Sequence, residues 1–171
     1  LFWIITSLGR KLILQEEKEL STASLIAIMG AGAVGALACT FSDTMWFSAV
    51  EGEVYALSTF FIAIVMWAIM KWEGRADEPG ANRWLVLIAY LIGLSIGVHL
   101  LSLLLLPIAV LVYYFKKYKV TTFRTMIALV VGMIALSVVQ VGVIQILTSV
   151  ASKIEMMFVN SMGMPFNSGL L

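Results

Sequence analysis

Long uncharged runs alternate with short polar segments along the chain. Four runs, at residues 22–41, 54–70, 85–114 and 125–147, contain no Asp, Glu, Lys or Arg. Each is long enough for a helix to cross the roughly 30 Å hydrocarbon core of a bilayer. Continuous apolar runs favour helices, because the strands of a membrane barrel alternate polar and apolar residues. The pattern predicts an all-α, polytopic helical membrane protein with spans at 22–41, 53–70 and 125–147.

Basic residues indicate which loops share a side of the membrane. All except Lys153 form three basic segments, with members Arg10, Lys11 and Lys18, then Lys71, Arg75 and Arg83, then Lys116, Lys117, Lys119 and Arg124. Because basic loops stay cytoplasmic, all three should lie on that side. Residues 42–52 carry no Lys or Arg and should lie outside. Trp72 and Trp84 then fall at the inner interface and Trp46 at the outer one, where tryptophans form aromatic belts.

The run at 85–114 has a basic segment at each end, which conflicts with a single crossing. One straight helix over this run would be about 45 Å long and would carry one basic segment outside. A hairpin of two half-helices keeps both inside, and Gly93, Ser95 and Gly97 lie near its midpoint, where a turn needs permissive backbone. Limbs of roughly 21 Å would end within the membrane, short of the far surface. We therefore expect an intramembrane hairpin at about 85–114, with one long tilted helix as the alternative.

The C-terminal part differs from the spans. Residues 148–160 place Val150, Ile154, Met157 and Phe158 on one helical face, which predicts a short helix in the outer interface. The chain opens in an apolar run without an initiator Met and stops where another apolar stretch could begin. We therefore expect residues 1–171 to form a single transmembrane helical region inside a larger protein.

Composition supports a membrane protein and excludes little else. The chain is 61% hydrophobic and 12% charged, with a mean hydropathy of +1.02, whereas soluble domains are nearer half apolar and a quarter charged. A net charge of +1 gives no reason to expect nucleic acid as a partner. The single cysteine, Cys39, lies in an apolar run, so neither an internal disulfide nor a redox motif is expected.

The segment "GAGAVG" at 30–35 matches the dinucleotide-binding fingerprint in its letters. That fingerprint needs a preceding strand and a helix that opens beneath the glycines, but here the glycines lie within an apolar run. Small residues spaced four apart, Gly32 with Ala36 and Ala31 with Gly35, are typical of membrane helices that approach closely. We interpret the segment as helix packing.

Three carboxylates, Asp43, Glu51 and Glu53, interrupt the apolar sequence near its predicted outer boundary. Capping explains part of this, because Ser42 or Asp43 can begin a short helix and acids favour the first turn of the next helix. Glu51 and Glu53 point apart if both are helical, but Gly52 between them permits a turn from which they could share a ligand. A cation, a sugar hydroxyl or a protein amine would suit them, so capping and function both stay open.

His99 is the only histidine and lies at the centre of the 85–114 run. A neutral imidazole bonded to a neighbouring helix is the simplest interpretation. Ionisable residues inside a membrane are functional candidates by default, and a histidine can hold a phosphate or move a proton.

Three stretches together carry a resemblance: "VEGEVYALS" (50–58), "GLSIGVHLL" (93–101) and "MPFNSG" (164–169). In this order they resemble the polytopic, protein O-mannosyltransferase-like membrane glycosyltransferases of the GT-C superfamily, and their bacterial branch in particular. The resemblance implies transfer of a sugar from a polyprenyl-phosphate-linked donor to a protein or other acceptor. It also implies a bacterial inner (cytoplasmic) membrane location, with the acidic loop 42–52 periplasmic.

The same resemblance suggests roles for individual residues. Glu53, with Glu51 beside it, matches the superfamily's acidic active-site position before a membrane helix, while His99 matches the polar residue of a short hairpin near the donor phosphate. Asp43 is a further candidate for substrate binding, and a divalent cation is a possible cofactor. The family's catalytic acid, in a first outer loop followed by a "HPP"-type stretch, has no counterpart here. We therefore expect the catalytic base to lie outside this chain, which alone should be inactive.

Two other function classes fit some of these features. Broken helices and ionisable residues at mid-membrane also suit secondary transporters, although no internal repeat of the helix pattern is visible. A non-enzymatic membrane scaffold would be favoured if Glu51, Glu53 and His99 lay far apart.

Overall fold

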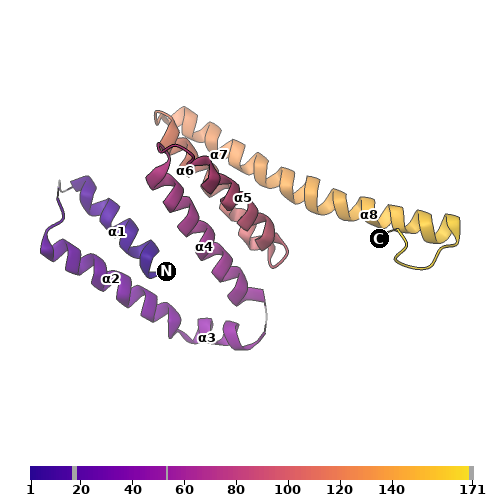
Figure 1. The fold of residues 1–171 in the computed structure, drawn as a ribbon, viewed down its shortest axis with the longest axis horizontal. Coiled ribbons are helices and arrows are strands. Elements are labelled where there is room, and N and C mark those ends of the chain that lie inside the picture. The colour runs from indigo at the N-terminus through magenta and orange to yellow at the C-terminus, as the bar shows by residue number, and fades with distance from the viewer. Residues whose placement is uncertain (17–18, 53, 170–171) are drawn as a thin grey trace. The chain divides into compact units, whose positions relative to one another are not determined.

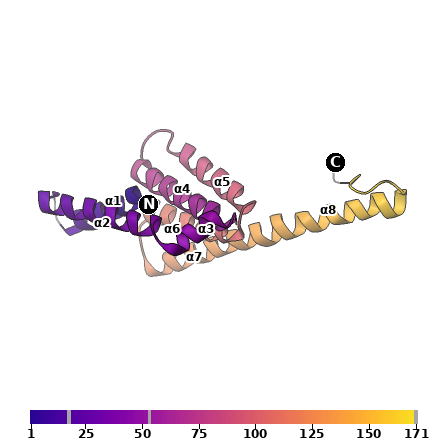
Figure 2. The ribbon, with the colours of Figure 1, turned by 90° about the horizontal axis from the view of Figure 1, so that it is seen from below.

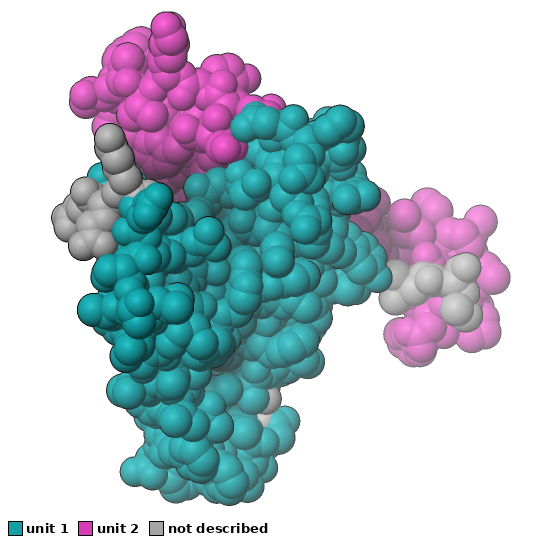
Figure 3. All heavy atoms as spheres, turned by 60° about the vertical axis from the view of Figure 1, so that its left-hand side comes forward, with its two compact units in different colours: residues 1–105 teal, residues 106–171 magenta. Residues whose placement is uncertain are grey.

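A computed structural model describes residues 1–16, 19–52 and 54–169, and within them every regular element is helical (Figure 1). The α-helices are α1 (Phe2–Glu16), α2 (Thr22–Thr40), α3 (Asp43–Val50), α4 (Val54–Arg75), α5 (Asn82–Ile96), α6 (Leu105–Lys117), α7 (Thr122–Ser137) and α8 (Ile146–Met156). Three other helical stretches are η1 (Leu100–Leu104), of 3₁₀ type, and η2 (Val138–Gln145) and η3 (Met157–Ser161), with wider π-type turns. The helices form two compact units, residues 1–105 and residues 106–171 (Figure 3).

Four helical stretches in the described residues are long and apolar enough to cross a membrane. They are Thr22–Thr40, Val54–Arg75, Leu100–Lys117 and Thr122–Ser161, and α5 is a shorter apolar helix. Large hydrophobic side chains are exposed along all of them, as expected where lipid replaces water. The prediction of an all-α, polytopic membrane protein is confirmed.

Helices α1 and α2 pack closely through two glycines. A Cβ atom on Gly32 would lie 2.5 Å from Cγ2 of Thr6, and one on Gly35 would lie 2.7 Å from Cδ1 of Ile5. A side chain at position 32 would clash with Thr6 and Phe2, whereas at position 35 it would displace the end of the Ile5 side chain. Since "GAGAVG" also lies inside one continuous helix, the packing interpretation is confirmed, and the strand–turn–helix of a nucleotide site is absent from this stretch.

The C-terminal part of α4 packs along α1 in the first unit. Lys11 forms an ion pair with Glu73, and Nζ of Lys71 lies 4.8 Å from the ring centroid of Trp3. The first two basic segments are therefore at one end of this unit, which we call the basic end. Helix α3 connects the opposite ends of α2 and α4, and we call that end the acidic end.

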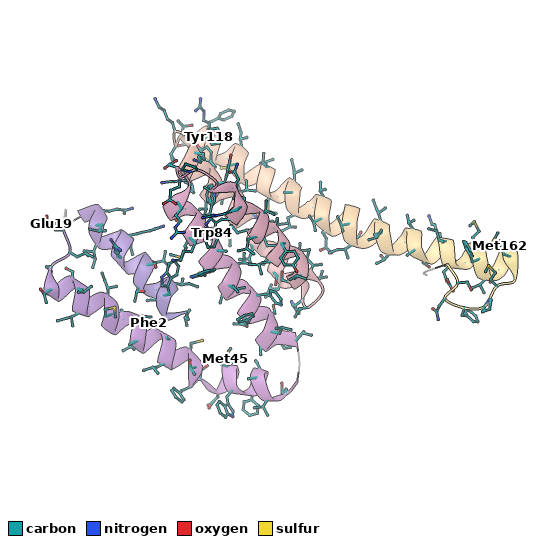
Figure 4. The ribbon with its side chains drawn as sticks, in the orientation of Figure 1. Phe2, Glu19, Met45, Trp84, Tyr118 and Met162 are labelled. Atoms are coloured by element: carbon teal, nitrogen blue, oxygen red, sulfur yellow. The ribbon has the colours of Figure 1, made fainter. Side chains whose placement is uncertain are left out.

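The predicted inner aromatic belt is wrong for Trp72. Its side chain is only 1% exposed, so it is packed inside the protein and cannot anchor a lipid interface. Trp84 is half-buried and stacks edge-on against Trp67 at 5.7 Å (Figure 4). Trp46 is 64% exposed, as an interfacial tryptophan should be. An indole ring is equally stable in a protein core and at a membrane surface, so composition alone did not separate these cases.

The run at 85–114 is bent. Helix α5 ends at Ile96, and His99 has an extended backbone (φ −159°, ψ 133°) before η1 begins. Trp84 contacts Trp67 near one end of α4, and His99 contacts Tyr55 at the other, so α5 runs antiparallel to α4. The bend is therefore level with the first turn of α4, and its depth in the membrane stays a prediction. The residues that follow Ile96, which are extended at His99, lengthen the first limb of the run beyond the end of α5. A return of the second limb to the same membrane side stays a prediction.

In the second unit, α6 and α7 form a close antiparallel pair. A Cβ on Gly132 would lie 2.8 Å from Cα of Pro107, so the two backbones almost touch there. At the connecting turn, the Tyr114 hydroxyl donates to the carbonyl of Lys119 (3.2 Å) and accepts from the backbone N–H of Thr121 (3.2 Å). The turn is thus fixed to the end of α6.

From α7 to η3 the chain is one unbroken helix, Thr122–Ser161, in both views (Figures 1 and 2). Its 40 residues make it about 60 Å long, twice the hydrocarbon thickness. The segment 148–160, expected as a separate interfacial helix, continues the preceding span without a break. Its place relative to the membrane stays a prediction.

The "MPFNSG" stretch folds back onto this long helix. The carboxylate of Glu155 accepts the backbone N–H groups of Asn167 and Gly169, the latter at 2.8 Å, and Asn167 has a left-handed φ of 70°. The resemblance motif at 164–169 therefore has a local structural role, which is to hold a tight turn against α8.

Candidate functional site

The acidic segment begins with a capped helix. The Ser42 hydroxyl accepts the backbone N–H of Met45 (3.3 Å), and Asp43 occupies the first turn of α3. A carboxylate is favourable there because it faces the positive end of the helix dipole. The capping interpretation of Ser42 and Asp43 therefore fits the structure, and a role of the exposed Asp43 in substrate binding stays a prediction.

Glu51 occupies the opposite end of α3. It is the C-terminal capping residue, with its backbone N–H bonded to the carbonyl of Phe47 (3.0 Å). A carboxylate is unfavourable at the negative end of a helix, so Glu51 is not explained as a cap of α3. The exposed side chain has no ion-pair partner among the residues that the structure describes.

Gly52, which follows, has a φ of +68° and ends α3 in the left-handed region. This confirms that Gly52 supplies a turn between the two glutamates. Glu53 lies outside the described residues. Its role, and a ligand shared between Glu51 and Glu53, stay predictions.

The structure separates Asp43 from Glu51. They lie at the two ends of an eight-residue helix, about 12 Å apart along its axis, so one small cation cannot bind both. In residues 1–16, 19–52 and 54–169, no three His, Cys, Asp or Glu side chains lie close enough to hold a metal ion. A cation site here would need Glu51 together with Glu53.

His99 caps η1 and contacts α4. Its Nδ1 accepts the backbone N–H of Leu101 (3.1 Å), so this nitrogen carries no proton and the proton of the neutral ring is on Nε2. The imidazole packs against the ring of Tyr55, with centroids 5.5 Å apart and planes inclined at 50°. The simplest interpretation had the imidazole bonded to a neighbouring helix; instead it accepts the backbone N–H of Leu101, two residues further along the chain. The half-buried ring keeps one N–H donor, on Nε2, that no described residue accepts.

Two buried hydroxyl groups belong to the same elements. Ser58 is one turn beyond Tyr55 on α4 and is 3% exposed, and Ser102 on η1 is fully buried. Neither hydroxyl has a hydrogen-bond partner among the described residues. By contrast, the equally buried hydroxyl of Ser95 donates to the carbonyl of Ile92 (2.7 Å). A buried polar group without a partner costs about 1–3 kcal/mol, so Ser58 and Ser102 are candidates for contact with a polar partner.

A groove of about 620 Å³ lies beneath α3 at the acidic end of the first unit. Four alanines from α2, α3 and α4 line it, and their small side chains leave the space open. They are Ala36, Ala49, Ala56 and Ala63. Phe2 and Met45, labelled in Figure 4, line it from α1 and α3.

Its lining is almost entirely apolar in character. The hydroxyls of Thr40 and Thr59 donate to carbonyls of their own helices, at 2.8 and 2.9 Å, and so expose mainly methyl groups. The groove therefore suits a hydrocarbon chain better than a sugar.

The fold thus brings together groups that the sequence shows only as separate motifs. His99 lies beside Tyr55 in the first turn of α4, and the next residue, Ala56, lines the apolar groove, although His99 and Tyr55 do not line it themselves. Tyr55 and the alanines were missed as site residues. Tyr55 lies inside "VEGEVYALS", which was a usable signal, whereas an alanine in an apolar run gives none.

Comparison with known proteins supplies the family. The model of the protein O-mannosyl-transferase TMEM260 N-terminal domain matches residues 1–122, which is 122 of the 171 residues. No curated protein and no solved structure gave a match. The predicted resemblance to protein O-mannosyltransferases is confirmed at the level of the family, and membership of a bacterial or GT-C branch stays a prediction. The matched region holds the acidic segment, Tyr55, His99 and the whole groove. This chain belongs to the protein O-mannosyl-transferase TMEM260 N-terminal domain family, and its function class is that of an O-mannosyltransferase-type glycosyltransferase.

Proposed function

We propose that the acidic end of the first unit is the donor site of a membrane glycosyltransferase. The donor is a sugar linked to polyprenyl phosphate, and the acceptor is a hydroxyl group of a protein. Transfer takes place on the outer side of the membrane, with residues 42–52 periplasmic in a bacterial inner membrane. The family supports the transferase class, and the arrangement of the acidic end supports the donor.

The groove suits the lipid part of such a donor. A polyprenyl chain is a branched hydrocarbon, and burial of apolar surface stabilises its complex by roughly 25 cal/mol per Å². Space for the chain is left by four small residues, Ala36, Ala49, Ala56 and Ala63. The threonine hydroxyls already donate to carbonyls of their own helices, so they need no hydrogen bond from a ligand. A soluble nucleotide-sugar donor would need polar groups that this lining lacks.

His99 carries the proposal. When the sugar leaves, negative charge develops on the donor phosphate, and a hydrogen-bond donor fixed in a water-poor site stabilises that charge. The bond from Leu101 holds Nδ1, so the N–H on Nε2 is oriented and available. Ser58 and Ser102, buried on the two elements that meet at His99, would supply further donors once a phosphate is present.

We assign Glu51 and Glu53 to the acceptor side of the reaction. The acceptor hydroxyl attacks the anomeric carbon, the bond from that carbon to the phosphate oxygen breaks, and the hydroxyl proton passes to a base. We assign the base to a part of the enzyme other than this chain, and give Glu51 and Glu53 the orientation of the acceptor or the binding of a divalent cation.

Two substitutions of His99 distinguish the role of its Nδ1 from the role of its Nε2. In the full-length enzyme, His99→Asn keeps an acceptor near the Nδ1 position but removes the Nε2 donor, whereas His99→Gln places an amide N–H near Nε2 and loses the cap. Transfer from polyprenyl-phosphate-linked mannose to an acceptor protein should fall by about 10²-fold in the Asn variant and by less in the Gln variant. Donor dependence and the thermal unfolding midpoint should be measured for both.

The opposite pattern would refute the donor site. If the Asn variant were fully active and the Gln variant unfolded, His99 would be a helix cap and nothing more.

A further inference from the structure

A second groove, of about 640 Å³, lies between α6 and α7 in the second unit. Its apolar walls come from both helices and include Val110, Ile127 and Val131. At the turn that joins the helices, it is bordered by Tyr118, labelled in Figure 4, and by Arg124 in the first turn of α7. It is thus apolar along its length and cationic at one end.

Fixed side chains define that end. Tyr114 is buried and holds the turn by its hydrogen bonds to Lys119 and Thr121. The ring of Tyr118 stacks on that of Tyr114, with centroids 6.1 Å apart and planes inclined at only 16°. Further along the helices, Gly132 brings α7 close to Pro107 of α6. The turn end of the groove is therefore formed by packed and hydrogen-bonded residues.

The charge around the turn has one sign. Four basic residues lie between positions 116 and 124, and no Asp or Glu occurs from 106 to 154. Lys119 and Arg124 are exposed. A guanidinium forms paired hydrogen bonds with phosphate oxygens, and a basic segment next to a membrane helix is attracted to anionic lipids of the cytoplasmic leaflet. This turn is the third basic segment, which the charge pattern predicts to be cytoplasmic.

We propose that the groove between α6 and α7 binds an anionic glycerophospholipid of the inner leaflet. One acyl chain lies against Val110, Ile127 and Val131, and the headgroup phosphate contacts Arg124 and Lys119. An apolar wall that ends in a cation and an exposed tyrosine matches the sequence of chemical groups in such a lipid, from acyl chain through ester region to phosphate. The site is in the second unit and on the predicted inner side, so it is independent of the donor site proposed above.

The test uses the full-length protein in nanodiscs of neutral phosphatidylcholine with and without phosphatidylserine. Native mass spectrometry counts retained lipids, and the unfolding midpoint is measured in parallel. Arg124→Gln removes the cation, and Val131→Trp fills the groove while keeping it apolar. The matched controls are Lys153→Gln, an exposed cation elsewhere in the same unit, and Val130→Trp, at an exposed position that does not line the groove.

We expect phosphatidylserine to be retained in preference to phosphatidylcholine and to raise the unfolding midpoint. Arg124→Gln should weaken this preference about fivefold, and Val131→Trp should abolish retention of both lipids at this site. The two controls should behave like the unmodified protein. The fivefold effect should shrink at high salt, because salt screens exposed charges.

Three results would overturn the proposal. The first is the absence of any preference for the anionic lipid. The second is an equal loss in Lys153→Gln, which would indicate general surface charge. The third is cross-linking of a photoreactive residue at position 131 to protein alone, which would show that another segment of the full-length chain covers the groove.

Discussion

The two ends of the first unit treat their polar groups in opposite ways. At the basic end, Lys11 is paired with Glu73, and Lys71 lies over the ring of Trp3. At the acidic end, Glu51 has no ion-pair partner among the described residues, and His99 keeps a free N–H on Nε2. The buried hydroxyls of Ser58 and Ser102 have no hydrogen-bond partner among the described residues, and at the basic end the same holds for the indole N–H of Trp84.

On the function proposed above, this difference separates polar groups that hold the fold from polar groups that contact the substrate. A paired group contributes to stability, and its loss should lower the unfolding midpoint while leaving catalysis intact. A group without a partner inside the chain contributes nothing to stability or reduces it, so its loss should affect turnover alone. Each prediction below tests one side of this contrast.

The largest effect is expected for Glu53→Gln in the full-length enzyme. Transfer should fall by about 10²–10³-fold, because a carboxylate that orients the acceptor or binds a cation acts where charge develops. Expression and the unfolding midpoint should be unchanged. Asp43→Asn is the comparison variant: if Asp43 only favours the start of α3, the change should cost about 0.3–1 kcal/mol of stability and no activity, whereas a loss of activity would support its predicted role in substrate binding. Normal turnover in Glu53→Gln would reduce the acidic segment to helix capping.

The packing of α1 on α2 gives the largest effect on stability. Alanine normally stabilises a helix by about 1 kcal/mol relative to glycine, but at position 32 its Cβ would clash with Thr6 and Phe2. Gly32→Ala should therefore destabilise the protein by about 1–3 kcal/mol. Gly30 has open space around it, so Gly30→Ala should be neutral or stabilising. Thermal unfolding in detergent compares the two, and equal midpoints would show that the helices do not pack as described.

A smaller effect is expected for Ser102→Ala. Removal of a buried hydroxyl without a partner should leave the unfolding free energy unchanged or raise it by about 1 kcal/mol, while transfer should fall roughly tenfold, the equivalent of about 1.4 kcal/mol. Ser95→Ala is the control, since it removes a satisfied hydrogen bond and should lower stability without changing the donor dependence. If Ser102→Ala were as unstable as Ser95→Ala and fully active, the hydroxyl would be structural.

The smallest effect is expected for Glu73→Gln at the basic end. The side chains of the pair are 42% and 33% exposed, and exposed ion pairs contribute only about 0.2–1 kcal/mol. The unfolding midpoint should fall slightly, less so at high salt, and transfer should be unchanged. Glu78→Gln makes the same charge change at an exposed position and should shift nothing. If Glu73→Gln lost transfer at an unchanged unfolding midpoint, the paired groups of the basic end would not be purely structural, contrary to our expectation.

Much of the helix content was predictable from the sequence, and the contacts were not. A bilayer allows no unpaired backbone, so a long apolar run has to be a helix whatever surrounds it. Inside lipid, however, hydrophobicity does not distinguish a buried face from a lipid-facing one. This is why Trp72 was placed at an interface when it is packed in the core.

The candidate site shows the same limit. Asp43, Glu51 and His99 could be selected from the sequence because ionisable groups are rare among apolar ones. Tyr55 gave no charge signal, and its contact with His99 joins residues 44 positions apart, 55 and 99. The groove exists because small side chains from several helices lie next to one another. A single alanine in an apolar helix does not predict which residues of other helices will lie beside it.

The sequence by itself determined that this protein is a set of membrane-spanning helices with one acidic and several basic connections, because water, lipid and charge act on each segment separately. Only the tertiary structure decided that the bend at His99 reaches the first turn of α4 and that a hollow opens beneath α3. Those features depend on the relative length, rotation and close approach of helices, and these are set by contacts between residues far apart in the chain.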